Sequence, residues 1–324
     1  MNAPELPAPV PSPLPALVLV AHGTRRGKGV EMIAALAEAV GRELGPRPAP
    51  DGTRCVHNSA DRRGIYAGQN PRDRRAAILP AAHLSAVCGC AGDPLAEPGA
   101  GRFTTSTSVR TAFVDVLGPS PSEVLRDLAA QSPNIADPAP AVLVPAFLAS
   151  GYHVYKDVPR EVDESAHPAV TVTSAMGPDP ALARIMSVRL RAAGWRPGDA
   201  VVFAAAGSSD PRARTDVRRA AAMLTAQLAT PVRTAYVATG APRVPEVVAK
   251  LRSEGKQRVF IASYLLAHGL FHERLHEAGA TGVADPIGVH PAAVRLIADR
   301  YRAALRERSG LPTLPPTGTA NLRS

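Results

Sequence analysis

The sequence predicts an α/β protein of two similar halves, each a doubly wound, mostly parallel sheet with flanking helices. Three observations predict this fold. Short Val-, Leu-, Ile- and Ala-rich segments alternate with helical patterns, as in parallel sheets with right-handed crossovers. The same order of segments occurs twice in the 324 residues. Apolar residues make up 45% of the chain and aromatic residues only 4%, which is typical of an aliphatic sheet core.

The first half begins with an apolar strand at residues 16–21, which ends in His-Gly-Thr. A helical pattern follows at residues 30–44, where Ile33, Leu36 and Val40 share one face. The later segments of this half alternate in the same way. Strands are predicted at 109–116, 141–148 and 170–174, and helices at 123–130, 155–165 and 180–193, the last of which opens with proline.

The second half repeats this order. Strands are predicted at 200–205, 232–238 and 258–266, and helices at 212–229, 244–253 and 291–308. The match extends to individual residues, because Val-Leu-Val-Ala-His-Gly-Thr in the first half corresponds to Val-Phe-Ala-Ala-Ala-Gly-Ser in the second. This alignment sets His22 opposite Ala206, and a second matching pair of segments sets His153 opposite Phe271. An internally duplicated fold with its chemistry retained in one half is therefore predicted.

Composition predicts where the domains begin and end. We expect a disordered arm at residues 1–16, one domain at 17–194, a second at 195–308 and a disordered tail at 309–324. The first domain is interrupted by an insertion at about residues 46–108, which has no counterpart in the second half. Clustered arginine, proline and glycine without periodicity favour either disorder or a loosely held excursion in this insertion.

Charge and composition exclude several classes of function. The net charge of +9 comes from arginines that are spread along the chain. They either belong to an ordinary solvated surface or attract a polyanionic ligand. Few aromatic residues argue against nucleic-acid binding by base stacking, and no strand is followed by a glycine-rich phosphate loop. The first sixteen residues lack the features of a signal peptide or membrane span, so a cytoplasmic protein is predicted.

Two histidines directly after predicted strands are the main candidates for a functional site. His22 follows the strand at 16–21 and His153 follows the strand at 141–148. The carboxyl ends of parallel strands meet at one edge of a sheet, where ligands bind. Two neutral imidazoles there suit a divalent metal such as iron, cobalt, nickel or zinc. Asp115 either completes a two-histidine, one-carboxylate set with open coordination positions or is an ordinary turn acid.

The cysteines are a weaker candidate for a metal site. All three lie in the insertion together with two histidines, and their spacing matches no standard iron–sulfur or zinc pattern. The residues concerned are Cys55, His57, His83, Cys88 and Cys90. We favour free thiols over a soft-metal site, and no disulfide framework is expected.

Two clusters in the second half also have alternative interpretations. His268, His272 and His276 recur every four residues and so share one helical face, which either captures a metal or is an ordinary surface helix; we favour the surface helix. The cluster of Ser208, Ser209 and Asp210 is interpreted as a helix N-cap and not as a nucleophile.

Three motifs at strand ends resemble those of one known family. They are Val-Ala-His-Gly-Thr-Arg around His22, Phe-Val-Asp-Val-Leu-Gly-Pro-Ser around Asp115, and Val-Pro-Ala-Phe-Leu-Ala-Ser-Gly-Tyr-His-Val ending after His153, with Asp157-Val-Pro behind it. In this order they resemble the sirohydrochlorin chelatases, the class II, ATP-independent chelatases of sirohaem and cobalamin synthesis, in their long two-half form. The resemblance covers about residues 17–306 apart from the insertion.

The resemblance implies an enzyme that inserts Fe²⁺ into sirohydrochlorin, with His22 and His153 binding the metal and taking pyrrole protons. The family commonly has glutamate where Asp115 stands, so the acid is one methylene shorter here. Insertion of Co²⁺ in cobalamin synthesis is the alternative reaction. A non-catalytic carrier of metal or tetrapyrrole is the alternative from another class.

The same resemblance defines the expected partners. These are a tetrapyrrole and a divalent metal, with no cofactor beyond the substrate metal, no nucleic acid and no membrane, for a monomer or homodimer. Sirohydrochlorin is ringed with carboxylates, so Arg25 and Arg26 either orient it or are ordinary loop charges.

Overall fold

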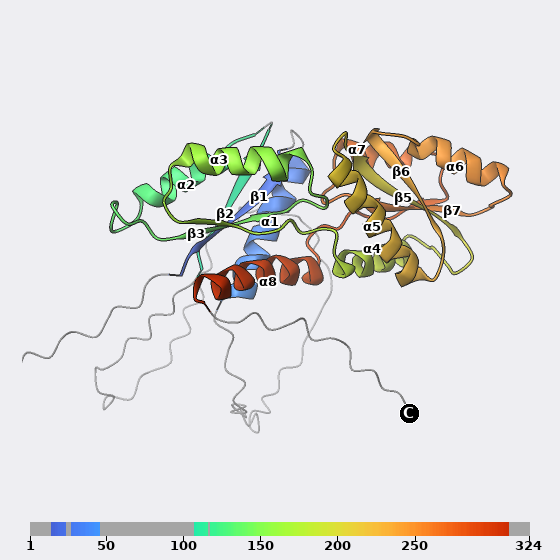
Figure 1. Ribbon diagram of the computed structural model, residues 1–324. Coiled ribbons are helices and arrows are strands. Elements are labelled where there is room, and N and C mark those ends of the chain that lie inside the picture. The colour runs from blue at the N-terminus through green and yellow to red at the C-terminus, as the bar shows by residue number, and fades with distance from the viewer. Residues whose placement is uncertain (1–13, 24–26, 46–106, 116, 311–324) are drawn as a thin grey trace, which may run out of the picture. The chain divides into compact units, whose positions relative to one another are not determined.

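The structure is a computed structural model that describes residues 14–23, 27–45, 107–115 and 117–310 (Figure 1). All of these residues belong to one compact unit. Almost the whole predicted insertion, with its three cysteines, lies outside the described residues, as do most of both predicted termini. Within the described part of the chain, no helix is both long enough and apolar enough to cross a membrane.

The first half contains a four-stranded parallel sheet with the strand order β2-β1-β3-β4. Its strands are β1 (Ala16–His22), β2 (Val109–Val114), β3 (Ala141–Pro145) and β4 (Val170–Val172). Its helices are α1 (Gly27–Leu44), α2 (Pro121–Ala130) and α3 (Val158–Ser165), the last preceded by a π-helical turn (His153–Asp157). Strand β1 lies at the centre because both of its faces are apolar and fully buried.

The second half repeats this sheet with the order β6-β5-β7-β8. Its strands are β5 (Ala200–Gly207), β6 (Val232–Thr239), β7 (Val259–Tyr264) and β8 (Gly282–Val283). Helices α5 (Pro211–Leu228), α6 (Val244–Ser253) and α7 (Leu270–His276) connect them. The predicted class, two duplicated parallel sheets with flanking helices, is confirmed.

Most predicted elements are present, and the differences have local causes. The strand predicted at 109–116 ends at Val114 because Asp115 adopts a positive φ of 81°, which no extended strand allows. Helix α7 falls where the spacing of the three histidines indicated a helical face, whereas strand β8 was not predicted. At 2 residues, β8 is too short to show a periodic apolar pattern.

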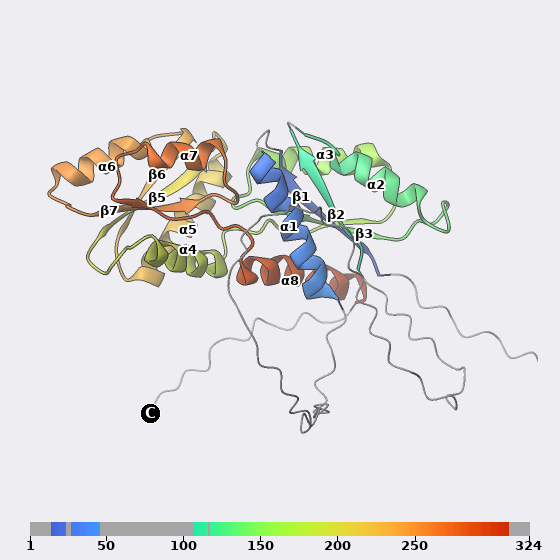
Figure 2. The ribbon, with the colours of Figure 1, turned by 180° about the vertical axis from the view of Figure 1, so that it is seen from behind.

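The last helix of each half packs on the sheet of the other half (Figures 1 and 2). Helix α4 (Pro180–Ala192) follows the first sheet in sequence but packs against α5 and β7. Helix α8 (Pro291–Arg308) ends the second half but packs against α1 and β3. Tyr301 of α8 donates a hydrogen bond to the carbonyl of Pro15 at 2.6 Å, directly before β1. The two halves therefore exchange helices.

This exchange contributes strongly to the main core. Ile185 and Leu190 of α4 and Ile297 of α8 are all fully buried, and they belong to one apolar cluster that includes residues of both sheets. Each buried side chain of this size contributes about 1.5–3 kcal/mol. The predicted boundary between residues 194 and 195 thus separates each sheet from a helix that covers it.

Candidate metal centre

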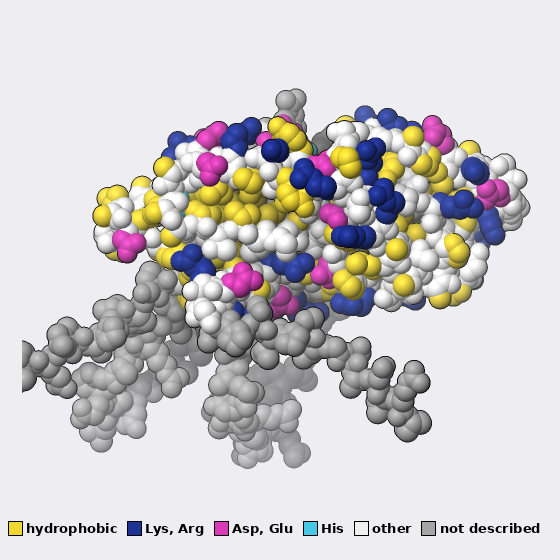
Figure 3. Space-filling model, viewed as in Figure 1, with side chains coloured by type: hydrophobic (Ala, Val, Ile, Leu, Met, Phe, Trp, Pro, Cys, Tyr) yellow, Lys and Arg dark blue, Asp and Glu magenta, His cyan; other side chains and the backbone are white. Residues whose placement is uncertain are grey.

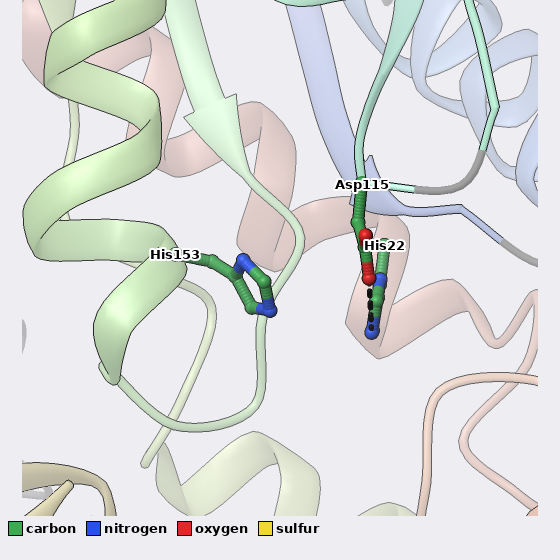
Figure 4. Close-up of side chains that lie close together, drawn as sticks. All are labelled: His22, Asp115 and His153. Atoms are coloured by element: carbon green, nitrogen blue, oxygen red, sulfur yellow. Dashed lines mark ion pairs between the residues drawn. The ribbon is translucent and has the colours of Figure 1, made fainter.

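The candidate site lies at the carboxyl edge of the first sheet. His22 is the last residue of β1, and Asp115 follows β2 directly. His153 opens the π-helical turn that comes after β3. Because β1 pairs with β2 on one side and β3 on the other, the three side chains arrive at the same place (Figure 4).

The three side chains are close enough to share one metal ion. Nε2 of His22 lies 4.0 Å from Oδ2 of Asp115, and the ring centroids of His22 and His153 are 5.0 Å apart. One potential ligand atom from each residue lies within 4.8 Å of the others. Two ligand atoms that bind one ion at about 2.1 Å each are at most about 4.2 Å apart. Small side-chain rotations would therefore complete a site.

The environment of His22 favours the neutral imidazole that a metal requires. Burial lowers the pKa of His22 below its usual value of 6.5, and nearby His153 lowers it further. Asp115 and the carbonyl of Val114 act in the opposite direction, but the net shift is downward. The His22 and Asp115 side chains are about half exposed, so the site faces solvent on one side. The site therefore offers an unprotonated ring nitrogen of His22 and is open to an incoming metal ion.

His153 is held in place by a carboxylate of its own helix. Its Nδ1 lies 2.6 Å from Oδ2 of Asp157, a largely buried group that also pairs with Arg160 at 3.2 Å. In the neutral ring, Nδ1–H donates to the carboxylate and leaves the lone pair on Nε2. Such a partner is typical of metal-binding histidines. Asp157 was not predicted as a partner of His153, although its spacing of four residues from that histidine was a usable signal.

The loop that carries His153 packs against the start of α5 in the second half. The amide of Ser150 donates to Oδ2 of Asp216 at 2.9 Å, and the Arg212 guanidinium lies 3.9 Å from the ring centre of Tyr155. A shallow cavity of about 370 Å³ is found here. It is lined by Tyr152, Ser209, Asp210, Pro211 and Arg212. Helix α5 carries Arg212, Arg214, Arg218 and Arg219, and basic side chains gather over this helix in Figure 3.

The remaining predicted residues differ in outcome. Asp210 is the N-cap of α5 and accepts a hydrogen bond from the amide of Arg212 at 2.8 Å, which confirms the predicted cap. Arg25 and Arg26 lie outside the described residues. The surface-helix interpretation is wrong for His272, which is only 5% exposed. His268 lies before helix α7 and so does not share a helical face with the other two histidines.

The matching positions of the second half hold no metal ligands. Ala206 stands at the end of β5 and Phe271 in α7, opposite His22 and His153. Both pack with Val237 against the apolar cluster beneath α6. Apolar side chains packed against this cluster thus stand where the first half has the candidate ligands His22 and His153.

Comparisons with known proteins agree with this architecture. A family model described as CbiX matches twice, at residues 100–193 and 200–304. The structure of SirB from Bacillus subtilis with Fe³⁺ is 18% identical with a TM-score of 0.64, and the match covers 92% of this chain and 98% of that one. CbiX, the terminal enzyme for biosynthesis of sirohaem in denitrifying bacteria, is 19% identical with a TM-score of 0.52, covering 89% and 99%. No curated protein sequence matches this chain.

Proposed function

Since this chain belongs to the CbiX family, we propose that it is a chelatase that inserts a divalent metal, with Fe²⁺ as the favoured ion, into sirohydrochlorin. The observation that carries the proposal is the convergence of His22, His153 and Asp115 within 4.8 Å at one sheet edge. Two imidazoles and one carboxylate leave coordination positions open, as a site must do if it passes its metal on.

Metal insertion combines two events, and both need the residue types present here. The ion must exchange water for pyrrole nitrogens while the macrocycle loses pyrrole protons. We expect His153 to present Nε2 to the ion, since its Nδ1 is held by Asp157 at 2.6 Å. His22, whose lowered pKa keeps it neutral, is placed beside His153 and is suited to bind the ion or accept a proton.

Basic residues near the site suit a substrate ringed with carboxylates. Arg25 and Arg26 follow His22 closely in the chain and are proposed to orient the macrocycle. Arg212 borders the cavity beside Tyr152 and is a further candidate, although its guanidinium also pairs with Asp210 at 2.9 Å. We propose no cofactor beyond the substrate metal.

Cobalt is the second candidate metal. A structure of SirB from Bacillus subtilis subspecies spizizenii is in complex with cobalt, and its 17% identity and TM-score of 0.59 relate its fold to this chain. Histidine ligands bind either ion, so the choice between them is a matter for measurement.

The test is anaerobic incubation of the full chain with excess sirohydrochlorin and Fe²⁺, then Co²⁺. The absorbance of the macrocycle is followed against protein-free controls. We expect many turnovers per chain, and the faster metal identifies the preferred substrate. Stoichiometric binding without turnover would contradict a chelatase and favour a carrier of metal or tetrapyrrole.

A further inference from the structure

A second group of potential metal ligands lies at the carboxyl edge of the second sheet. His268 lies in the loop after β7, and His272 is on α7, which that loop leads into. Asp285 comes two residues after β8, the neighbour of β7. The parallel pairing of β7 and β8 therefore brings these three residues together.

The geometry of this group is as close as that of the first site. One potential ligand atom from each of His268, His272 and Asp285 lies within 4.8 Å of the others. The rings of His268 and His272 have centroids 4.8 Å apart and are nearly perpendicular, at 86°. Asp285 is exposed, and its Oδ2 lies 3.9 Å from the Arg189 guanidinium.

His272 has the surroundings of an oriented ligand. It is almost fully buried, and its Nε2 lies 3.1 Å from the carbonyl oxygen of Ala284, the residue before Asp285. In the neutral ring, Nε2–H donates to this carbonyl and leaves the lone pair on Nδ1. Burial lowers the pKa of His272 below its usual value. A ring N–H bound to a backbone carbonyl is a common support for metal-binding histidines.

This group is not a copy of the first site. The repeat sets His268 opposite Ser150 and His272 opposite Val154, and it sets Asp285 opposite Ser174. None of these first-half residues belongs to the candidate centre at His22. The second half thus has ligating side chains of its own, at the ends of β7 and β8 rather than of β5 and β6.

We propose that His268, His272 and Asp285 bind a second divalent transition-metal ion, of the borderline class that includes Zn²⁺, Co²⁺ and Fe²⁺. Three protein ligands leave coordination positions open, so the ion is exchangeable and is not a structural ion in a closed shell. The proposal is independent of the chelatase activity, because it uses none of the residues of the first site.

One simpler arrangement must be distinguished from this site. His272 and His276 are also four residues apart, with ring centroids at 5.0 Å, and such a pair on one helix can bind a metal by itself. Asp285 and His268 belong only to the proposed site, whereas His276 belongs only to the alternative. Substitutions at these exposed residues separate the two arrangements without altering buried His272.

The test is a Zn²⁺ titration of the full chain against a competing chromophoric chelator, in a His22→Ala/His153→Ala background that removes the first site. His268→Ala and Asp285→Asn are each expected to lower the affinity for one Zn²⁺ ion per chain by at least about tenfold. Loss of even a hydrogen-bond partner of a metal ligand typically lowers metal affinity by about 10- to 100-fold. His276→Ala is the matched control and is expected to leave that equivalent unchanged. Circular dichroism checks the fold of every variant.

Two results would overturn the proposal. Unchanged Zn²⁺ affinity in folded His268→Ala or Asp285→Asn would remove that residue from any site. A loss in His276→Ala equal to the loss in His268→Ala would assign the ion to the helix histidines instead. Cysteines elsewhere in the chain do not affect the result, because every comparison is made within one background.

Discussion

The two halves share one backbone plan but differ at the side chains that end their strands. In the first half, β1 ends in His22, and in the second half the matching position of β5 is Ala206. His153 likewise corresponds to Phe271, which joins the apolar cluster beneath α6. The same fold thus supports an open polar site in one half and a hydrophobic contact in the other.

The residues that form the two sheets differ from the residues of the candidate site in how far the fold depends on them. The strands β1, β3, β5 and β7 are largely buried, and the strand order is the same in both sheets. The candidate ligands His22 and His153 lie at or beyond a strand end, where a side-chain substitution leaves the backbone hydrogen bonds of the sheet in place. Function can therefore be gained or lost there at little cost to the fold.

The largest expected effect comes from making the first half resemble the second. His22→Ala and His153→Phe introduce the second-half residues, and each should reduce metallation at least about 100-fold, because each removes a metal ligand and a proton acceptor. Initial rates of sirohydrochlorin metallation measure this loss, with circular dichroism as the check on folding. His290→Ala, at the start of α8, is a histidine control outside the site. Full activity in a folded His22→Ala or His153→Phe variant would exclude that histidine from the mechanism.

Helices α4 and α8 are each expected to stabilise the sheet of the other half. Ile185→Ala in α4 and Ile297→Ala in α8 both truncate fully buried side chains, and each should lower the free energy of unfolding by about 2–5 kcal/mol. Amide hydrogen exchange should rise mainly in β5 and β7 for Ile185→Ala, and mainly in β1 and β3 for Ile297→Ala. The reverse pattern would contradict the helix exchange.

A smaller effect is expected where a carboxylate only positions a ligand. Asp157, whose counterpart in the repeat is Leu275, accepts a hydrogen bond from His153. Asp157→Asn should weaken Co²⁺ binding at the first site by about 10- to 100-fold without unfolding the chain. Dialysis against graded Co²⁺ measures the affinity. Glu164→Gln, in the exposed part of the same helix, is the control. An unchanged Kd in Asp157→Asn would show that His153 needs no such partner.

Asp115 should matter less than either histidine, because its replacement by asparagine keeps an oxygen that can face the ion, whereas an alanine or phenylalanine in place of a histidine offers no ligand atom. Asp115→Asn is expected to lower the metallation rate by about tenfold or less, a loss of up to about 1.4 kcal/mol of transition-state stabilisation. Asp115→Glu restores the acid with the longer side chain common in the family. A loss as large as that of His22→Ala would place Asp115 among the essential residues.

The smallest effect is expected from removing the difference in length between the halves. Helix α5 connects to β6 through only Ala229, Thr230 and Pro231, whereas the long segment 45–108 separates α1 from β2. Replacing residues 45–108 with Ala-Thr-Pro should leave folding and metallation within about twofold of the parent, less than about 0.5 kcal/mol. Thermal unfolding and the metallation assay test this. Failure to fold would assign a structural role to the replaced segment.

The sequence by itself determined the order of strands and helices, the duplication and the two histidines. These follow from local patterns, because apolar periodicity and glycine or proline signals are read within a few residues. Helix α6 was predicted at its observed bounds, Val244–Ser253, and α8 at Pro291–Arg308. His22 and His153 could be paired because parallel topology alone brings strand ends to one edge.

Tertiary structure decided what depends on contacts between distant residues. The apolar face of α4 shows that it must be buried, but not that it covers the sheet of the other half. Asp285 lies seventeen residues beyond His268 in sequence, and only the pairing of β8 with β7 brings it to the two histidines. Burial of an apolar face is favourable against any complementary surface, whereas a cluster of ligands exists only where packing fixes several chain segments together.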